Sequence, residues 1–286
     1  MILRRLFAHC LVSGAILTCA LAVVIRDDTS DSLYRQLGNR AAFSPVGRVE
    51  MDFGDGNGYQ AIGTATLYRT DRVVSAGHVF DSSALDGVVG VRLNFGRGRI
   101  AYIDFLTPGV VNVNPGYNPR TLANDVSVVF LPTSFHVDPA NLYTGRRVQR
   151  NTTITFVGYG DTGTGLTGSK TYSIVKRGGQ NSLGNYYMGG RDFEVDFDRP
   201  GYPSYSSFGS SAPLRLEGLL GPGDSGGSVW IKRGHRWLLI GINSYGLDWY
   251  PRGQGNGVED DYGDHSGFVY LPRYYAWMNS LTGPTP

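Results

Sequence analysis

Short runs of apolar, β-branched and aromatic residues, separated by turn-forming residues, fill most of the chain after Gly47. Residues 47–53 and 59–69 flank the sequence Gly-Asp-Gly-Asn-Gly, which predicts a β-hairpin. Further strands are predicted in a first set over 72–80, 88–96, 101–113 and 124–132, and in a second set over 152–160, 171–179, 192–198, 227–232, 237–246 and 267–272. Two sets of short strands predict an all-β protein made of two packed β-barrels.

The same pattern indicates where the domains begin and end. Residues 132–147 read as a connector, so we expect one barrel over 41–135 and a second over 136–286. A helical pattern is confined to residues 272–281, where Pro272 lies near the first turn, and it predicts a short C-terminal helix. Residues 23–40 are polar and are interpreted as a lead-in or a short pro-segment.

The first 22 residues are typical of a secretory signal peptide. A short basic start containing Arg4 and Arg5 precedes a long apolar run, and Ala20-Leu21-Ala22 offers a small-residue cleavage site. The alternative is an uncleaved membrane anchor, because the run is nearly long enough to span a bilayer. We expect cleavage, and therefore a secreted or periplasmic protein with no membrane contact afterwards.

Cysteine usage and charge exclude several classes of function. Cys10 and Cys19 both lie in the signal segment, so the mature protein would have no disulfide, cysteine nucleophile or cysteine-based metal site. Without Arg4 and Arg5 the chain has 24 basic and 24 acidic residues, and this balance makes nucleic acid an unexpected partner. Residues 55–58 and 163–171 resemble a calcium loop and a phosphate-binding loop, but both motifs are incomplete. No metal or organic cofactor is predicted.

Ser225 lies in a glycine-rich stretch, residues 221–230, and is either a structural turn residue or a nucleophile. A serine hydroxyl is a poor nucleophile at neutral pH. It needs a base to accept its proton, a group that orients the base, and donors for the oxyanion. The chain should therefore hold a histidine and a carboxylate in suitable positions.

His78 and Asp125 are the candidates for these two roles. His78 follows the apolar strand 72–77, where its side chain can be held rigidly, and Asp125 stands at the start of strand 124–132. Taken alone, each is more readily explained as a structural residue. The other histidines lie in less suitable segments, namely the signal (His9), the connector (His136), a tight turn (His235) and a Gly/Asp-rich loop (His265).

Together, three stretches resemble the motifs of the trypsin/chymotrypsin-like serine peptidases. They are Ser-Ala-Gly-His-Val-Phe around His78, Asn-Asp-Val-Ser-Val-Val-Phe-Leu around Asp125, and Gly-Asp-Ser-Gly-Gly-Ser-Val-Trp around Ser225. Residues 158–160 and 244–246 also resemble family segments. The resemblance runs from about Val46 to Trp277 and implies two packed six-stranded antiparallel barrels with a short C-terminal helix. The lack of cysteines resembles a bacterial branch.

The resemblance also implies a role for each residue. Ser225 is the nucleophile, His78 the general base and then the general acid, and Asp125 fixes the histidine tautomer. Backbone N–H groups of Gly223 and Ser225 form the oxyanion hole. The resemblance further implies that Asp224 holds the loop around Ser225 through a buried ion pair and that Ser244 supports Asp125. The residues that it implies to contact substrate are Leu219, Tyr245 and Gly246.

Two features depart from the family pattern. No activation sequence of the usual kind is visible, so the cation opposite Asp224 is either a processed N-terminus within 23–41 or an arginine. Leu219 stands where a peptidase specific for arginine or lysine has an aspartate. Cleavage after basic residues is therefore disfavoured, and an apolar specificity pocket is expected. The alternative is that a carboxylate from residues 246–250 or 257–264 reaches into the pocket. The expected partners are protein or peptide substrates, and the expected state is a monomer.

Two other protein classes share part of this pattern. Gly223, Ser225 and Gly227 fit the nucleophile elbow of α/β-hydrolases, but that fold requires a helix after the serine, where this chain has a strand pattern. A non-catalytic serine-peptidase homologue that acts as a binding protein is the second alternative, because one fold serves many functions.

Overall fold

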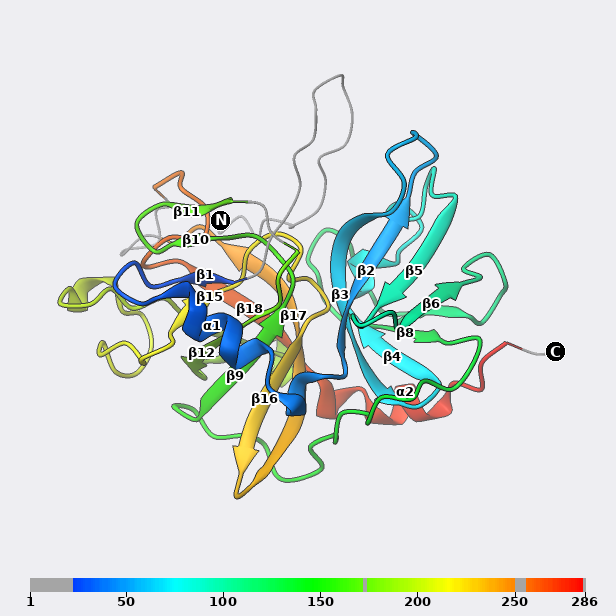
Figure 1. The fold of residues 1–286 in the computed structure, drawn as a ribbon. Helices are drawn as coiled ribbons and strands as arrows, with labels where there is room; N and C mark the ends of the chain where they lie inside the picture. Colours follow the sequence, from blue (N-terminus) through cyan, green and yellow to red (C-terminus); the bar gives the residue numbers. More distant parts are fainter. Residues whose placement is uncertain (1–22, 172–173, 250–255, 285–286) are drawn as a thin grey trace.

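The computed structural model describes residues 23–171, 174–249 and 256–284. Two curled antiparallel sheets lie side by side, and the chain passes from one to the other through the long connector that follows residue 130 (Figure 1). The predicted signal peptide, residues 1–22, lies outside the described residues, as do positions 172–173 of the strand predicted over 171–179. Around this gap the chain forms two separate strands, β11 (Gly168–Thr171) and β12 (Arg177–Ser182).

The first sheet forms the N-terminal barrel, in the strand order β6-β5-β2-β3-β4-β8-β7. Its alternating burial follows the sequence pattern: in β5, Val91 and Leu93 are buried between half-buried neighbours. The strands are β2 (Val46–Asp52), β3 (Gln60–Arg69), β4 (Arg72–Ser75), β5 (Gly90–Asn94), β6 (Ile100–Ile103), β7 (Val111–Val113) and β8 (Ser127–Phe130).

The second sheet forms the C-terminal barrel, in the order β12-β9-β16-β17-β18-β14-β13. Its remaining strands are β9 (Thr153–Gly158), β13 (Tyr186–Tyr187), β14 (Asp192–Asp196), β16 (Ser228–Arg233), β17 (Arg236–Leu247) and β18 (His265–Tyr270). Within the described residues each large sheet has seven strands, one more than the six expected, because the short edge strands β7 and β13 are included.

A third, small sheet holds the beginning of the described chain against the second barrel. Its order is β11-β10-β1-β15, formed with β1 (Val24–Ile25), β10 (Thr162–Thr164) and β15 (Gly218–Leu219). Strand β1 is parallel to β10 and antiparallel to β15, and its two residues are buried. Strand β1 thus ties the beginning of the described chain to the second barrel.

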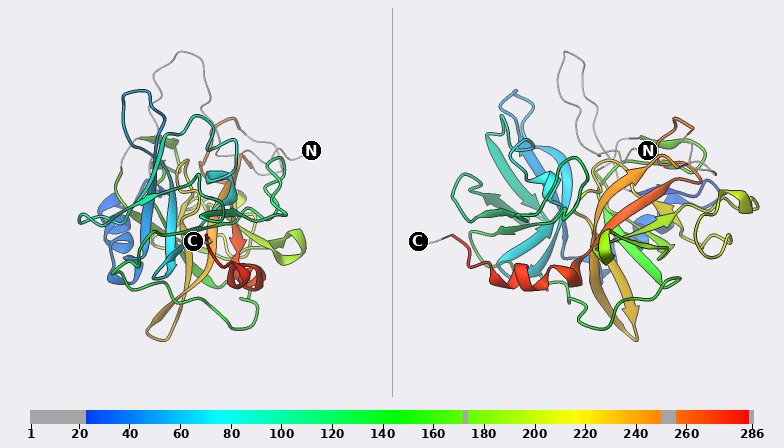
Figure 2. Two further views of the ribbon diagram at one scale, coloured as in Figure 1. Left: turned by 90° about the vertical axis from the view of Figure 1, so that its right-hand side faces the viewer. Right: turned by 180° about the vertical axis from the view of Figure 1, so that it is seen from behind.

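Two helices flank the sheets. The segment α1 (Asp31–Gly38) packs on β12 and buries Tyr34 and Leu37. The short C-terminal helix α2 (Tyr275–Ser280) follows a 3-10 turn containing Pro272 and lies below the first barrel (Figure 2). In the part of the chain that the structure describes, no helix is long and apolar enough to span a bilayer.

Each barrel has its own apolar core, and a third apolar cluster joins them. This third cluster combines Val46 and Val74 of the first barrel with Trp230 and Leu239 of the second, and Met278 of α2 closes it. The expected architecture, two packed antiparallel β-barrels of the chymotrypsin-like type with a C-terminal helix, is confirmed.

Candidate active site

His78 lies at the seam between the barrels. Strand β4 ends at Ser75 and the chain turns into a 3-10 helix, Gly77–Val79, which directs the histidine toward the second barrel. The backbone N–H of His78 donates to Asp125 Oδ1 at 2.8 Å, and this contact fixes the turn. The side chain is 5% exposed, so the imidazole is almost completely enclosed at the seam.

Asp125 is placed by the loop that leads into β8. Asn124 immediately before it adopts φ +56°, a left-handed conformation that asparagine tolerates better than most residues. The Asp125 carboxylate is completely buried. Its Oδ2 lies 2.8 Å from His78 Nδ1 and also accepts a hydrogen bond from Ser244 Oγ at 2.5 Å.

Ser225 stands on the turn before β16, and two glycines make this turn possible. Gly223 and Gly226 have φ of +86° and +78°. A Cβ on Gly226 would lie 2.0 Å from Ser75 Oγ, so that position has no room for a side chain. As a result Ser225 Oγ lies 2.7 Å from His78 Nε2.

The structure therefore brings His78, Asp125 and Ser225 into one hydrogen-bonded line. Burial by itself lowers the pKa of His78, but the charge and the hydrogen bond of Asp125 outweigh it, and the pKa of the imidazole is raised. An imidazole of this kind can accept a proton from the adjacent hydroxyl, because the carboxylate stabilises the resulting cation.

The backbone N–H groups of Gly223 and Ser225 have no acceptor within the described residues. The turn is held by its carbonyl groups instead: Thr64 Oγ1 donates to the Gly223 carbonyl at 3.1 Å, and the Thr64 N–H donates to the Ser225 carbonyl at 2.8 Å. Two N–H groups of a rigid turn thus remain available to an incoming oxygen.

Thr64, on β3, is a positioning residue that sequence reasoning missed. It belongs to the first barrel yet holds the serine turn of the second, and its own Oγ1 accepts the N–H of Tyr159 at 3.2 Å. Nothing in the pattern of 59–69 distinguishes it from other small residues of the strand. Its role depends on a contact 159 residues away in sequence.

Asp224 is fully buried beneath the serine turn. Within the described residues every hydrogen bond to its carboxylate comes from backbone: Gly160 N–H reaches Oδ1 at 2.9 Å, and Val23 and Gly221 N–H groups reach Oδ2 at 2.9 and 3.1 Å. Burial raises the pKa of Asp224 to about 6, although these donors oppose the shift. The position opposite Asp224 is thus occupied by the backbone nitrogen of Val23.

The remaining candidate residues occupy two places. Ser244, Tyr245 and Gly246 lie on β17, and Ser244 touches the His78–Asp125 pair as described above. Leu219 lies in β15, pairs with Val24 and is buried in the core of the second barrel. The structure therefore brings Ser244 to the His78–Asp125–Ser225 line and places the Leu219 side chain inside the barrel.

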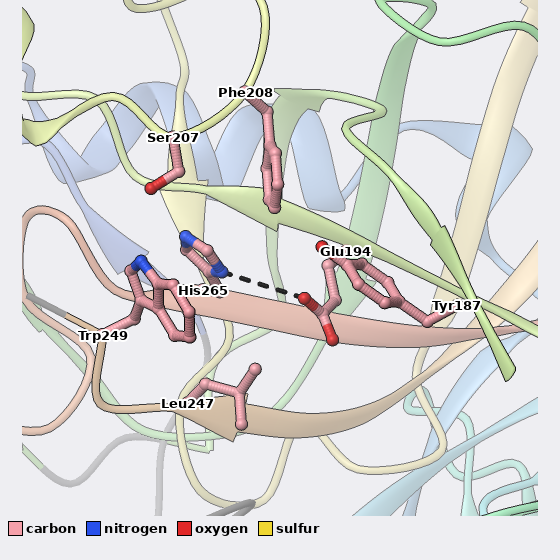
Figure 3. Close-up of a pocket in the computed structure, with 7 residues that line it drawn as sticks. All are labelled: Tyr187, Glu194, Ser207, Phe208, Leu247, Trp249 and His265. Atoms are coloured by element: carbon pink, nitrogen blue, oxygen red, sulfur yellow. Dashed lines mark ion pairs between the residues drawn. The ribbon is translucent and has the colours of Figure 1, made fainter. Parts of the chain in front are cut away.

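A pocket of about 510 Å³ lies beside this strand, beyond Leu247 (Figure 3). It contains His265, which the sequence pattern assigned to a loop but which is the buried first residue of β18. His265 Nδ1 lies 3.8 Å from Glu194 Oε2, and Glu194 Oε1 accepts the Tyr245 hydroxyl at 2.9 Å. The ring of Tyr245 crosses β18 above Gly267, where a Cβ would lie 2.0 Å from it.

Among the described residues, no group of His, Cys, Asp or Glu has an arrangement that could hold a metal ion.

A comparison with protein families decides the identity of the fold. The family model described as Trypsin matches residues 46–201, more than half of the 286 residues. The chain belongs to the trypsin family. The matched region of this trypsin-family protein contains His78 and Asp125 and ends before Ser225. No curated protein matches the chain. Membership of the trypsin family makes the protein a serine peptidase of the trypsin-like type.

Proposed function

We propose that the protein is a secreted serine endopeptidase that cleaves peptide bonds through Ser225, His78 and Asp125. The observation that carries this proposal is the continuous line of hydrogen bonds, 2.8 Å from Asp125 to His78 and 2.7 Å from His78 to Ser225. The substrates are proteins or peptides, the reaction needs no cofactor, and the enzyme acts as a monomer in the periplasm or outside the cell.

The reaction proceeds in two halves. Ser225 Oγ attacks the scissile carbonyl while its proton passes to His78 Nε2, and Asp125 stabilises the imidazolium that forms. The imidazolium then donates this proton to the leaving amine as the C–N bond breaks, which leaves an acyl-enzyme. Water, deprotonated by His78, attacks the ester and releases the acid, and the proton returns to Ser225.

The oxyanion of each tetrahedral intermediate is stabilised by the N–H groups of Gly223 and Ser225. Support comes from their lack of acceptors within the described residues and from the rigid turn that Thr64 holds. Donors fixed before the reaction need no reorganisation when charge develops, and loss of one such donor costs roughly 10²- to 10³-fold in kcat.

We further propose that the mature enzyme begins at Val23, after cleavage at Ala20-Leu21-Ala22. A free ammonium on Val23 would face the Asp224 carboxylate, whose raised pKa reflects burial without a bonded cation. Val23 has φ of +56°, which a β-branched residue adopts only with strain, because its Cβ approaches the preceding carbonyl. Cleavage removes that carbonyl, so processing relieves the strain and supplies the cation in one step.

Specificity is proposed to favour apolar residues before the scissile bond. Leu219 lies in the apolar core of the second barrel and offers no charge to a basic side chain, in contrast to an aspartate at this position. The expected result is faster hydrolysis of peptides with Leu or Phe at this site than of those with Arg or Lys. A strong preference for Arg or Lys would contradict it.

Covalent labelling tests the catalytic proposal. A fluorophosphonate probe should label Ser225 of the secreted protein, and Ser225→Ala should not react. The intact mass of the labelled protein should correspond to a chain that begins at Val23. A folded protein that binds peptides but neither reacts nor turns them over would instead be a non-catalytic homologue.

Asp224→Asn tests the role of the N-terminus. It removes the charge opposite Val23, and labelling at Ser225 should slow by at least about 100-fold, since the turn that carries the oxyanion donors loses its anchor. Asp260→Asn is the matched control: Asp260 is also buried, its pKa is also raised by burial, and asparagine tolerates its positive φ. Equal effects of the two substitutions would count against the proposal.

A further inference from the structure

The pocket beside β17 is a built cavity whose walls are individually anchored. The Ser207 and Phe208 N–H groups both donate to Asp196 Oδ2, at 2.5 and 2.7 Å, and this fixes the upper wall. The Trp249 N–H donates to Asp264 Oδ1 at 2.6 Å and fixes the opposite wall. Such anchoring preorganises a cavity for a ligand rather than leaving a loose surface depression.

His265 supplies a hydrogen-bonding group inside this cavity. Its ring is 3% exposed and lies between Trp249, stacked at 5.0 Å, and Phe208, at 4.7 Å. Nδ1 faces Glu194, whereas Nε2 is buried and has no hydrogen-bond partner within the described residues. Figure 3 shows this second ring nitrogen on the side of the pocket formed by Ser207. A buried nitrogen without a partner is costly, and a ligand that pairs with it removes that cost.

The pocket shares Leu247 with β17, the strand that also contains Ser244. On one side β17 pairs with β18 as far as Leu247↔His265, whereas in the described chain its pairing with β16 ends at Ser228↔Ile242. Residues 244–247 therefore offer an open edge to which an extended peptide can add as a further strand. At about 3.3 Å per residue, Leu247 lies about 10 Å along the strand from Ser244.

We propose that this pocket binds a tyrosine side chain of the substrate, located three to five residues N-terminal to the scissile bond. The ring packs against Leu247, Trp249 and Phe208, and the hydroxyl donates to His265 Nε2. This inference rests on the proposed endopeptidase function and deepens it, because it assigns a sequence preference at a distance from the cleaved bond.

The chemistry of the lining favours an uncharged aromatic donor. Among the described residues no lysine or arginine lines the cavity, and the Glu194 carboxylate faces it, so an acidic side chain would meet a like charge. One Glu194 oxygen already accepts the Tyr245 hydroxyl, and an ammonium or guanidinium buried among Phe208, Leu247 and Trp249 would lose its hydration. A phenol brings a large apolar surface and one donor, which matches the single unpartnered nitrogen.

Paired peptides test the proposal without depending on turnover. Acetylated peptides that differ only in Tyr or Phe, at each position from three to five before the cleaved bond, are titrated calorimetrically into the Ser225→Ala protein. At one position Tyr should bind about 10-fold more tightly than Phe, because a site that hydrogen-bonds a hydroxyl discriminates against its absence. Hydrolysis of the same peptides by the unsubstituted enzyme measures the proposed function separately.

Variants of His265 assign the preference to this residue. In the Ser225→Ala background, His265→Phe should bring the Tyr/Phe ratio to about 1, and His265→Gln, which retains a polar group near the Nε2 position, should keep part of it. His235→Phe, in an exposed turn, is the matched control and should leave the ratio unchanged. A ratio near 1 at every position in the Ser225→Ala protein, a Tyr preference that persists in His265→Phe, or tighter binding of Lys or Arg peptides overturns the proposal. Absence of hydrolysis with a retained Tyr preference overturns only the proposed peptidase activity.

Discussion

The second barrel and its seam with the first contain two buried histidine–carboxylate pairs that differ in how completely they are satisfied. In the first pair, His78 Nδ1 lies 2.8 Å from Asp125 Oδ2, and His78 Nε2 lies 2.7 Å from Ser225 Oγ. In the His265–Glu194 pair the separation is 3.8 Å, and Nε2 has no partner among the described residues. Because both ring nitrogens of His78 have hydrogen-bond partners, this pair is arranged for proton transfer from Ser225. Because Nε2 of His265 has none among the described residues, the second pair can bind a hydrogen-bond donor from a ligand.

The largest effect should come from breaking the first pair. Asp125→Asn retains the shape but removes the charge and favours the wrong imidazole tautomer, so kcat should fall by roughly 10⁴-fold. Steady-state hydrolysis of a peptide ester measures it. A fall of less than tenfold would mean that Asp125 does not orient His78 during the reaction.

An intermediate effect should follow from removing the hydroxyl that supports Asp125. Ser244→Ala deletes a hydrogen bond of 2.5 Å to Asp125 Oδ2, and kcat/KM should fall about tenfold, since a hydrogen bond to a charged group contributes about 1.5–3 kcal/mol. Ser127→Ala serves as the control, because Ser127 is equally buried and donates to the Ala76 carbonyl instead. If both variants lose the same activity, the loss reflects packing.

The stability of the folded protein should depend on pH through Asp264, the residue that precedes His265. Burial raises the pKa of Asp264 to about 8, so the folded state holds this proton more tightly than the unfolded chain. The stabilisation that this bound proton gives to the folded state is complete below about pH 4, near the ordinary pKa of an aspartate. It is lost as the pH rises through about 8. The free energy of unfolding, measured with urea, should be lower at pH 8 than at pH 5, and Asp264→Asn should reduce this difference. An unchanged slope in the variant would exclude Asp264 as its source.

The smallest effect on catalysis should come from the second pair itself. Glu194→Gln preserves an acceptor for Tyr245 and removes the charge next to His265, and kcat for a substrate too short to reach the pocket should stay within about twofold. Assays with an ester of a single amino acid measure this. A drop comparable to that of Asp125→Asn would mean that the two pairs are coupled.

The sequence was informative wherever the decisive pattern was local. Period-two alternation and turn residues located most strands, and the glycines around Ser225 matched the positive φ angles that the turn requires. The helix after Pro272 followed from its position in the pattern. In each case neighbouring residues carry the signal, because backbone geometry and burial repeat over a few positions.

The features that escaped prediction depend on contacts distant in sequence. Val23 reaches Asp224 across 201 residues, and Thr64 reaches Gly223 across 159. The helix α1 was missed because its eight residues expose a mostly polar surface and bury little more than Tyr34 and Leu37. His265 follows a Gly/Asp-rich segment, and only pairing with Leu247 and Asp196 makes it a buried strand residue.

The buried position of Val23 also bears on how the protein should be made in the laboratory. An affinity tag joined directly ahead of this residue would have to emerge from the interior of the second barrel, where Val23, Val24 and Leu219 are completely enclosed. A tag after the exposed Pro284 meets no such obstacle. Protein that keeps a tag ahead of Val23 is expected to show the circular dichroism of a folded protein and no peptidase activity. The terminus chosen for the tag therefore decides whether activity is detected.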